Sequence, residues 1–576
     1  MVTVSGTVTV NGQPMPNEPS SNTRGYLRFI DQSTGDYTSA DLGSSGPGAY
    51  SVKIFAGTHE VQFSDGTYQT VLPGVRTRLD QGLSVQQSVT KNFDLKVVTI
   101  SGTVTVNGQP MPTEPSNNTR GYLRFLDTST GDYTSADLGS SGSAAYSVKI
   151  FAGTHDAQFS DGTYQTVLPG VRTQLDQGLS LQQSTTKNFD LKVVTVSGTV
   201  TVNGKPMPDD PSNNTRGYLR FIDLSTGDYT SAELFAAGPA NYNVKVFAGT
   251  HDVQFSDGTY QTVLPNLRTR LDKGLSLPQS ATKNYDLKTA TITGSVTING
   301  QTMPTDASNN TRGYLRFTDR STGDYTSADL GPAGAASYSV QVFTGTHDVV
   351  FSDGTYQTVL PQLRTLVQRG LVVQQSAKQD YDLKVVTVSG TVTVNGKPMP
   401  AEPSNNTRGY LRFANRLEGD YTSVDLGATG AASYSVKLFA TSYDVEFSDG
   451  TYQTVLPQLR TRLRTGCFDL GRCSASKTDV SGSWYLVPSM AYWTPVDLTL
   501  VQQGTGVSGT WYSSGLSGLL NSGSLSGDSL TFSFTSTCTV AVQAQLQSGC
   551  LMVGSMQASN CATTSPYSQF VGTRLP

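Results

Sequence analysis

Histidine, tryptophan and charged residues are all scarce in this sequence of 576 residues. It contains four histidines and three tryptophans, and Asp, Glu, Lys and Arg together make up 15% of it, against roughly 25% in an average soluble domain. Serine and cysteine nucleophiles usually need a histidine base, and all four histidines fall in near-copies of one stretch, "GTHEVQF". We therefore expect no enzyme of that kind, no metal site and no cofactor. The scarcity of histidine does not exclude catalysis by a pair of carboxylates that meet in a cleft.

Basic clusters and long apolar runs are also missing. The formal net charge is −4, and no basic patch favours nucleic-acid binding. No apolar run approaches the roughly 20 residues that span a bilayer, and no charged-then-apolar leader opens the sequence. Met1 falls partway through a segment that is continuous elsewhere, since "MVTVSG" corresponds to "VVTISG" from Val97. We therefore expect no transmembrane segment in this chain, and an upstream signal peptide or further repeats outside it.

Cysteine is absent from the first 466 residues, and the five cysteines follow: Cys467, Cys473, Cys538, Cys550 and Cys561. Their grouping suggests disulfides and an oxidising compartment. With a polarity carried mainly by Ser, Thr, Asn, Gln and Gly, this predicts an extracellular or cell-surface protein. Cys467 and Cys473 flank "FDLGR", and a bridge between them would fasten the last two segments together. The remaining three allow at most one further internal pair, and their spacing does not favour zinc.

A long internal repeat dominates what is present. "SGTVTVNG" begins at Ser5, Ser101 and Ser197, varies to "TGSVTING" from Thr293, and returns at Ser389, always 96 residues on. The fifth copy is shortened, because its "FDL" at Phe468 comes nine residues sooner than the register requires. The predicted domains are repeats over 1–96, 97–192, 193–288, 289–384 and 385–472, followed by a separate domain over 473–576.

Each repeat has the pattern of a β-sandwich. In the first copy, β-branched and aromatic residues alternate with polar ones over Val4–Val10, Tyr26–Ile30, Tyr50–Phe55, His59–Phe63, Tyr68–Leu72 and Phe93–Val97. Asn-Gly in "VNGQP" and Asp-Gly in "SDGT" predict tight turns between strands. No stretch has a helical period. About seven short strands in each copy indicate an all-β chain of tandem antiparallel, immunoglobulin-like or transthyretin-like sandwiches.

The stretches "VSGTVTVNGQPMP" and "GAYSVKIFAGTHEVQF" resemble the carboxypeptidase regulatory-like domain. The resemblance covers most of each repeat and implies a transthyretin-like sandwich, which is mainly a structural and binding module. Tandem arrays of this kind look like those of bacterial cell-surface proteins.

The recurring histidine has the phase of a core residue. In "THEVQFS", His59 shares its strand face with Val61 and Phe63, and the fifth copy has Tyr443 at this position. An aromatic ring with a polar tip therefore suffices there. We expect structural packing at His59, His155, His251 and His347.

The stretch "RGYLRF" places a tyrosine and an arginine on the outward face of one strand in every copy. A repeated exposed pair suits glycans, cell-envelope polymers or a neighbouring rod, although simple surface pairing across strands explains it better. The candidate contact residues are Tyr26, Arg28, Tyr122, Arg124, Tyr218, Arg220, Tyr314, Arg316, Tyr410 and Arg412. The adjacent "DQSTGDYTSAD" (31–41) loosely resembles a calcium loop, but a hairpin loop explains it better.

From Val480 the rhythm changes to consecutive hairpins, which predicts an up-and-down β-barrel. The stretch resembles lipocalin-like barrels, because "GSW" at Gly482 matches their Gly-x-Trp and Arg574 stands like their last-strand arginine. The resemblance implies that Arg574 covers Trp484 as a structural lock. Whether the interior is a pocket or is filled by side chains stays open.

Neighbouring repeats join without a flexible spacer, in stretches such as "FDLKVVTVSGTVTV", and we expect a stiff rod. The leading hypothesis is a non-enzymatic extracellular or cell-surface stalk that spaces or presents the C-terminal barrel. The alternatives are a repetitive adhesin or glycan-binding or ligand-binding protein, and a filament subunit that self-associates when the strand edge at Met1 accepts a strand from another chain.

Overall fold

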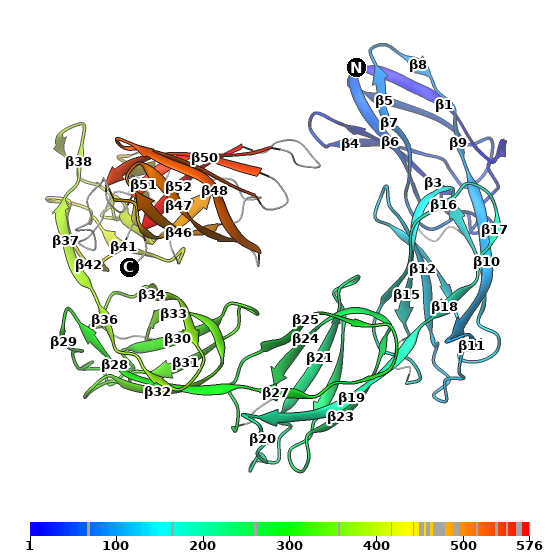
Figure 1. The fold of residues 1–576 in the computed structure, drawn as a ribbon. Coiled ribbons are helices and arrows are strands. Elements are labelled where there is room, and N and C mark those ends of the chain that lie inside the picture. The colour runs from blue at the N-terminus through cyan, green and yellow to red at the C-terminus, as the bar shows by residue number, and fades with distance from the viewer. Residues whose placement is uncertain are drawn as a thin grey trace. The chain divides into compact units, whose positions relative to one another are not determined.

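The computed structural model describes the chain apart from residues 66–69, 163–165, 259–261, 355–357, 416–417, 442, 449–453, 457–460, 465–478, 489–494, 514–515, 536–538, 549–550, 560–566 and 575–576. All helical or strand structure in the described residues is β-strand, which confirms the all-β prediction (Figure 1). The chain divides into two compact units. The first comprises Met1–Gln261 and Arg270–Leu287, and the second comprises Thr262–Thr269 and Lys288–Pro576.

No helix in the described part of the chain is long and apolar enough to cross a bilayer.

Repeat 1 consists of two facing sheets. Its strands are β1 (Val2–Val10), β2 (Gln13–Pro14), β3 (Gly25–Asp31), β4 (Tyr37–Asp41), β5 (Ala49–Ile54), β6 (Gly57–Asp65), β7 (Thr77–Val85), β8 (Val89–Thr90) and β9 (Phe93–Leu95). One sheet has the order β4-β3-β6-β7, and in the other β1 is the central strand, which pairs with β5 and with the short strands β2, β8 and β9. The inward residues of both sheets form one core, as a sandwich requires.

Repeats 2, 3 and 4 have the same sheets. In repeat 2 the strands are β10 (Val97–Val106), β11 (Gln109–Pro110), β12 (Gly121–Asp127), β13 (Tyr133–Asp137), β14 (Ala145–Phe151), β15 (Gly153–Asp161), β16 (Thr173–Leu181), β17 (Thr185–Thr186) and β18 (Phe189–Leu191). In repeat 3 they are β19 (Val193–Val202), β20 (Lys205–Pro206), β21 (Gly217–Asp223), β22 (Tyr229–Leu234), β23 (Asn241–Phe247), β24 (Gly249–Asp257), β25 (Thr269–Leu277), β26 (Ala281–Thr282) and β27 (Tyr285–Leu287). In repeat 4 they are β28 (Thr289–Ile298), β29 (Gln301–Thr302), β30 (Gly313–Asp319), β31 (Tyr325–Asp329), β32 (Ser337–Phe343), β33 (Gly345–Asp353), β34 (Thr365–Val373), β35 (Ala377–Lys378) and β36 (Tyr381–Leu383).

Repeat 5 keeps the four-stranded sheet and has less of the other. Its strands are β37 (Val385–Thr391), β38 (Thr393–Val394), β39 (Lys397–Pro398), β40 (Tyr410–Asn415), β41 (Tyr421–Asp425), β42 (Ser433–Phe439), β43 (Tyr443–Ser448) and β44 (Thr461–Arg464). The second sheet is reduced to the pairs β37-β42 and β38-β39 in the described residues.

Local sequence explains the strands. In β5, buried and exposed residues alternate strictly, which is the pattern of a strand with one face in the core. Asn11 and Gly12 link β1 to β2 with φ angles of 51° and 74°, the conformation that favours Asn-Gly in two-residue hairpins. Gly25 opens β3 because a Cβ there would lie 2.4 Å from the Phe63 ring.

The strand predictions need three corrections in repeat 1. The stretch read as a hairpin loop at 31–41 contains the whole of β4, and "RTRLDQGLSV" forms the long strand β7. The predicted strand at Tyr68–Leu72 is not seen, since its described residues Thr70–Leu72 are not in a strand. The sheets are also not wholly antiparallel, because β1 pairs in parallel with β8 and β9.

The same pairing corrects the filament hypothesis. Strand β1 bonds to β8 and β9 over Val4–Ser5 and Val8–Val10 on one side, and to β5 over Val2–Thr7 and β2 over Thr9–Val10 on the other. Most of β1 therefore has no open edge for a strand from another chain, and strand addition at Met1 has almost no free backbone to bind.

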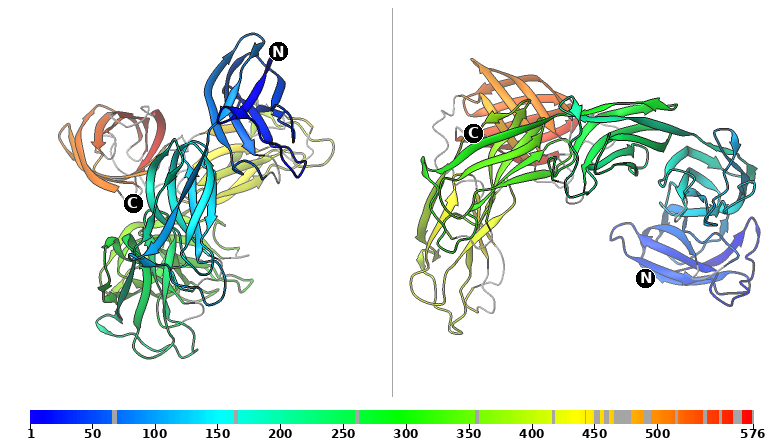
Figure 2. Two further views of the ribbon diagram at one scale, coloured as in Figure 1. Left: turned by 90° about the vertical axis from the view of Figure 1, so that its right-hand side faces the viewer. Right: turned by 90° about the horizontal axis from the view of Figure 1, so that it is seen from below.

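The C-terminal segment closes into a barrel of eight antiparallel strands, which is seen end-on in the left view of Figure 2. The strands are β45 (Gly482–Pro488), β46 (Val496–Gln503), β47 (Gly506–Ser513), β48 (Leu516–Ser526), β49 (Ser529–Thr535), β50 (Thr539–Ser548), β51 (Leu551–Ser559) and β52 (Tyr567–Arg574). Each strand pairs with the next, and β45 pairs with β52. The predicted up-and-down barrel is therefore present.

Candidate functional site

The recurring histidine is a core residue. His59, His155, His251 and His347 are at most 2% exposed, and Tyr443 at the fifth position is fully buried. His59 Nε2 lies 2.9 Å from the Phe55 carbonyl oxygen, and each histidine stands opposite an aspartate on the neighbouring strand, as His59 does opposite Asp31. Burial lowers the pKa of His155 and His251, while Asp127 and Asp223 oppose that shift. These features confirm the predicted packing role.

The predicted tyrosine and arginine array lies on the outer face of the four-stranded sheets, where Tyr26 and Arg28 are half-buried. The arginine does not stack on the tyrosine that the sequence pairs with it. The Arg28 guanidinium lies 5.0 Å from the ring centre of Tyr37 on β4. The other pairs and their distances are Arg124 and Tyr133 at 4.5 Å, Arg220 and Tyr229 at 4.6 Å, Arg316 and Tyr325 at 4.7 Å, and Arg412 and Tyr421 at 3.7 Å.

The stacked tyrosines are the residues that the sequence reasoning missed. Tyr37 and its counterparts Tyr133, Tyr229, Tyr325 and Tyr421 are 47–58% exposed, so one ring face holds the arginine while much of the ring meets solvent. The signal lay in "GDYTSAD", which alternates like a strand once it is not read as a loop. A fixed guanidinium beside an exposed ring can contact planar or apolar sugar faces with little loss of side-chain freedom.

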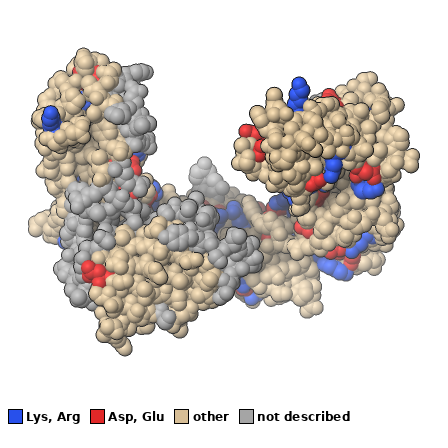
Figure 3. Space-filling model, turned by 90° about the horizontal axis from the view of Figure 1, so that it is seen from above, with Lys and Arg blue, Asp and Glu red and all other residues tan. Residues whose placement is uncertain are grey.

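Charge is thinly spread on the surface (Figure 3), where Lys, Arg, Asp and Glu form small islands among other residues. Many of the charges have defined partners, and the most regular of these pairings join one repeat to the next.

Each junction within a unit buries a phenylalanine from the following repeat. Phe151, which ends β14 of repeat 2, is 1% exposed and belongs to the core of repeat 1. Its ring meets that of Phe63 edge-on at 5.5 Å between centres. Phe247 meets Phe159 at 5.5 Å, and Phe439 meets Phe351 at 5.4 Å.

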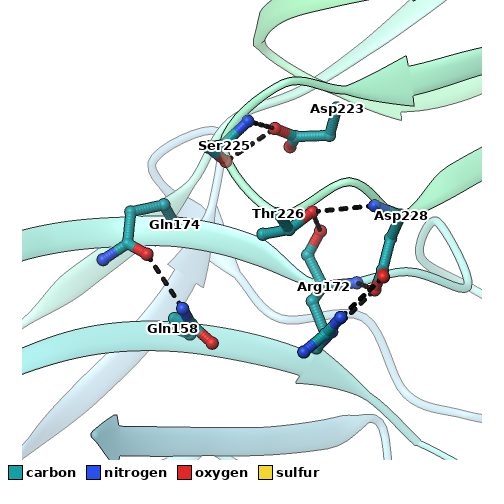
Figure 4. A network of polar contacts seen from close by, with 7 residues as sticks. All are labelled: Gln158, Arg172, Gln174, Asp223, Ser225, Thr226 and Asp228. Carbon is teal, nitrogen blue, oxygen red and sulfur yellow. Dashed lines mark hydrogen bonds and ion pairs between the residues drawn. The ribbon is translucent and has the colours of Figure 1, made fainter. Parts of the chain in front are cut away.

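A bidentate ion pair lies at the same junctions, and Figure 4 shows the one between repeats 2 and 3. Arg172 Nη2 and Nε each donate to the Asp228 carboxylate at 2.8 Å, and the Arg172 backbone N–H donates at 3.1 Å. Thr226 Oγ1 donates to the Arg172 carbonyl at 3.4 Å. The same arginine and aspartate positions pair at the other two junctions as Arg76 with Asp132 and Arg364 with Asp420. Within the second unit, Arg268 pairs with Asp324 in the same way.

The electrostatics of this pair follow from its geometry. The Arg76 side chain holds the pKa of Asp132 below its usual range, against the opposing effect of burial. In turn, the hydrogen bonds to Asp228 raise the pKa of Arg172. Both groups therefore stay charged over the whole physiological range. In repeat 2 the carboxylates at the corresponding turn positions are engaged, since Asp132 binds Arg76 and Asp127 accepts from Ser129 N and Oγ.

The backbone linker is also held. Asn11, in the β1–β2 turn, accepts from Val97 N at 3.0 Å and donates to Val97 O at 2.8 Å. Asn107 and Asn299 do the same with Val193 and Val385. β9 ends at Leu95 and β10 begins at Val97. Both the N–H and the carbonyl group of Val97, the first residue of the next repeat, are therefore hydrogen-bonded to the Asn11 side chain.

Each repeat buries an arginine that the sequence reasoning did not single out. Arg24 is fully buried, and its guanidinium donates to six backbone carbonyls, those of Met15, Pro16, Leu42, Gly43, Ser45 and Gly46, at 2.6–3.4 Å. Its counterparts Arg120, Arg216, Arg312 and Arg408 are equally buried. Strand alternation from Leu27 and Phe29 would point this residue outward, but Gly25 has a φ of 138° and breaks the phase.

A buried carboxylate ties a second loop to the sandwich. Glu114 accepts from Ser116 Oγ at 2.6 Å and from Thr166 N at 2.6 Å. These hydrogen bonds lower the pKa of Glu114 to about 2. Glu18 and Glu402 are bonded in the same way, with the same effect on their pKa values.

The structure brings together the predicted barrel pair. Trp484 is fully buried, and the Arg574 guanidinium lies 5.8 Å from its ring. Arg574 also donates to the carbonyls of Asp479 and Ser481, and Trp484 Nε1 donates to the Val480 carbonyl at 2.8 Å. Apolar side chains of the described residues form a core in the barrel, with Trp511 and Phe534 in contact at 5.0 Å between ring centres. All five cysteines, including the predicted Cys467–Cys473 pair, lie outside the described residues.

Within the second unit the outer wall of the barrel binds repeat 4. Asp497 on β46 forms ion pairs with Arg320 and Arg369, each at 2.6 Å. Arg320 stacks on Tyr512 at 4.4 Å and Arg369 on Tyr485 at 4.0 Å. Burial raises the pKa of Asp497, an effect that both guanidiniums oppose. A cleft of about 600 Å³ lies beside these residues.

Both arginines are peculiar to repeat 4 among the first four repeats. The residues at the Arg320 position are Gln32, Thr128 and Leu224 in the other three, and at the Arg369 position they are Gln81, Gln177 and Lys273. The two positions lie on separate strands or loops of one face of the repeat. A substitution by arginine at both positions in the same copy is therefore a specific sign that this face has its own partner. It was readable only by comparing the copies with one another.

No family model matches the chain, and none of the curated proteins matches it. Among solved structures, the chain is similar to the Bacillus anthracis TIE protein, with 7% identity, 62% of this chain and 68% of that chain covered, and a TM-score of 0.14. It is similar to a DUF3823 family protein from Parabacteroides merdae ATCC 43184, with 11% identity, 31% and 100% covered, and a TM-score of 0.13.

A third similar structure is a protein provisionally described as a cell adhesion protein from Bacteroides ovatus ATCC 8483. It has 13% identity, with 33% of this chain and 91% of that chain covered, and a TM-score of 0.16. At TM-scores this low, none of these similarities supports an argument about the function of this chain.

Proposed function

We propose that the chain is a non-enzymatic structural protein of the cell surface or extracellular space, in which the tandem sandwiches form a stalk that spaces or presents the C-terminal barrel. The observation that carries this proposal is the repeated junction. A buried phenylalanine, a bidentate ion pair and a bonded linker recur at the junctions within each compact unit, and such a joint resists bending better than a flexible linker does.

Magnitudes support a defined joint. Burying a phenylalanine side chain is worth about 1.5–3 kcal/mol, and a partly exposed ion pair adds about 0.2–1 kcal/mol. These contacts do not have to overcome the conformational entropy of a long flexible spacer, because only Lys96 separates β9 from β10. The buried phenylalanine and the ion pair act across a linker of one residue, and together they are expected to hold adjacent repeats in one arrangement.

The proposal is tested by the distribution of distances between labels on neighbouring repeats. Spin labels are attached at the exposed positions Gln87 and Gln183 by chemistry that does not use cysteine, and the distances are measured by pulsed electron resonance. We expect one narrow distribution in the wild-type chain and a broad one in the double variant Arg76→Gln, Phe151→Ser. Phe235→Ser, a change at a phenylalanine that is 65% exposed, is the matched control. A broad wild-type distribution would show a hinge and contradict the stalk.

A second candidate function, a repetitive adhesin, is favoured by the five stacked arginine and tyrosine pairs. Identical weak sites along one chain gain avidity from their number, and a preformed ring and guanidinium suit glycans or cell-envelope polymers. The test changes Tyr37, Tyr133, Tyr229, Tyr325 and Tyr421 to Ser one after another and measures binding to a glycan and envelope-polymer panel. A loss that grows with the number of changed sites supports the adhesin, whereas unchanged binding by the fivefold variant excludes this face.

A further inference from the structure

An Asn-Gly pair recurs in the same turn of every repeat, at Asn11, Asn107, Asn203, Asn299 and Asn395. An asparagine loses its side-chain amide more readily before glycine than before other residues, because glycine has no Cβ to hinder the approach of its backbone nitrogen to the asparagine side chain. Asn11, Asn107 and Asn299 are exposed, so water reaches all three turns. These turns therefore combine the sequence and the solvent access that spontaneous deamidation requires.

The junction to the next repeat holds the asparagine side chain. Asn11 Oδ1 accepts from Val97 N at 3.0 Å, and Asn11 Nδ2 donates to Val97 O at 2.8 Å. Deamidation begins when Cγ of the asparagine bonds to the nitrogen of the following glycine. The side chain must turn for that step and give up both of its hydrogen bonds to the valine. The same two bonds, at the same two distances, join Asn107 to Val193 and Asn299 to Val385.

The glycine nitrogen is held as well. Gly12 N donates to Asp94 Oδ1 at 2.8 Å. Burial raises the pKa of Asp94, but hydrogen bonds from Lys96, Gly12 and Thr9 lower that pKa by more, so the carboxylate is ionised at neutral pH. To attack, the glycine nitrogen must lose its proton, and a second negative charge beside a carboxylate is unfavourable. The same bond, also at 2.8 Å, is made by Gly108 with Asp190 and by Gly300 with Asp382.

The valine that holds each asparagine lies in the sealed part of the junction. Val97 is paired with Phe151 in the sheet of repeat 2, and Phe151 is buried in the core of repeat 1. Moving repeat 2 out of the junction therefore removes the phenylalanine and the partner of the asparagine together. In the same way Val193 is paired with Phe247, and Val385 with Phe439.

We propose that Asn11, Asn107 and Asn299 are deamidation sites that the closed junctions protect, and that a junction which opens makes its own asparagine reactive. In the reaction, the Gly12 nitrogen loses its proton to solvent and bonds to Asn11 Cγ. The bond from Cγ to Nδ2 breaks, and the amide nitrogen leaves as ammonia. Water then opens the cyclic imide to aspartate or isoaspartate. Overall an amide and water become a carboxylate and an ammonium ion, so no other reactant is needed.

The product weakens the junction in which it forms. A carboxylate has no N–H, so the Val97 carbonyl loses its donor and faces a negative charge. Isoaspartate also adds a methylene group to the main chain, which a two-residue turn of defined φ does not accommodate. Conversion is therefore one-way, and a junction that has opened stays weaker than its neighbours. The proposal goes beyond the stalk and does not rest on it, because it needs only the junction contacts and no particular role of the array.

The test measures deamidation at each turn of the full chain during incubation in mildly alkaline buffer. Trypsin releases Asn11 in residues 1–24 and Asn107 in residues 97–120, and mass spectrometry quantifies the converted form of each. Because a protected site reacts only from its open state, we expect Asn11 to react at least about tenfold more slowly in the folded chain than in the synthetic peptide "VTVNGQPMP".

A variant of one junction provides a sharper comparison. Phe151→Ser should raise the rate at Asn11 about tenfold or more, because loss of a buried ring raises the population of the open state. Asn107 should keep its wild-type rate, since its junction is sealed by Phe247. Arg76→Gln, which weakens the first junction at its partly exposed ion pair, should also raise the rate at Asn11, by a smaller factor.

Phe235→Ser, a change at an exposed phenylalanine, is the matched control and should alter neither rate. Wild-type Asn11 that reacts as fast as the peptide would overturn the proposed protection. An unchanged rate at Asn11 in both junction variants would separate the reaction from the junction, and equal acceleration at Asn107 would indicate general unfolding. Label distances in the unconverted chain test the stalk, and none of these rates bears on them, so the two proposals fail separately.

Discussion

At the scale of single residues, Arg24 and its four counterparts are unusual because a cation is fully buried without a bidentate carboxylate. The charge is stabilised by backbone carbonyls from two loops, whose partial negative charges all point at one guanidinium. Burial lowers the pKa of Arg24, yet arginine stays protonated in proteins. The Arg24 side chain, rather than a strand or a helix, therefore holds these two loops together.

Arg120→Lys is expected to destabilise repeat 2 by about 2–4 kcal/mol, because an ammonium group has three donors and leaves several buried carbonyls unsatisfied at about 1–3 kcal/mol each. Hydrogen exchange resolved to repeat 2 measures the loss. Arg124→Lys on the outer face is the control, where a change within about 0.5 kcal/mol is expected. Equal effects at the two sites would contradict the carbonyl cage.

Glu114 predicts a dependence on acid. Its pKa is lowered to about 2 in the folded chain from an ordinary value of 4.5. Because the folded value is the lower one, the charged form stabilises the fold, fully above about pH 4.5 and progressively less as the pH falls towards 2. Glu114→Gln should remove this part of the pH dependence of repeat 2, and hydrogen exchange between pH 7 and 2 tests it. Parallel pH profiles for variant and wild type would contradict the assignment.

At the scale of elements, the junction strand gives a clean comparison within one molecule. Phe151→Ala is expected to cost about 3–5 kcal/mol of junction stability, the usual cost of removing a buried phenylalanine. Phe55→Ala makes the same change in the same local sequence and should cost less than about 0.5 kcal/mol. Amide exchange in β10 and β6 measures both, and similar values for the two variants would mean that Phe151 is not buried by repeat 1.

The elements show what the sequence could predict. Alternation predicted β3, β5 and β6 and the inward histidines, because those residues face a core inside their own repeat. It missed β2 and β8, which have two residues each and no pattern of their own, whereas the predicted strand at Phe93–Val97 contains β9. It also could not predict the junctions. Phe151 follows the inward Ile150 and by alternation should face solvent, as Phe55 does; only the neighbouring repeat buries it.

Only the outward placement of the candidate tyrosine and arginine array was predicted, because the contact that each arginine makes depends on a neighbouring strand. Arg28 and Tyr26 were correctly placed outward, but the partner of Arg28 is a diagonal neighbour on the next strand. Which side chains meet across β3 and β4 depends on the register of the two strands. That register depends on the turn between them, and the whole stretch 31–41 had been predicted as a loop. The barrel lock at Trp484 and Arg574 was predictable because a resemblance supplied both residues.

At the scale of the whole molecule, the contact between the barrel and repeat 4 makes a directed prediction. Arg320→Gln with Arg369→Gln places the residues of repeat 1 at both positions and leaves Asp497 without its partners. We expect faster hydrogen exchange at the surface of β46 and easier cleavage before residue 479 by a protease. Lys273→Gln, the same change at the Arg369 position of repeat 3, is the control and should alter neither. Unchanged exchange in the double variant would show that Asp497 does not hold the barrel there.

The uniformity of the junctions has a consequence for inheritance. Since the joints within each compact unit use the same phenylalanine, arginine and aspartate positions, excision or duplication of one 96-residue repeat by recombination between the near-identical coding segments would rejoin matching surfaces at those joints. The array can therefore change its reach in steps of whole units without any compensating substitution. Arg320 and Arg369 set the limit of this freedom, because the unit that carries them is the one copy whose loss would also detach the barrel.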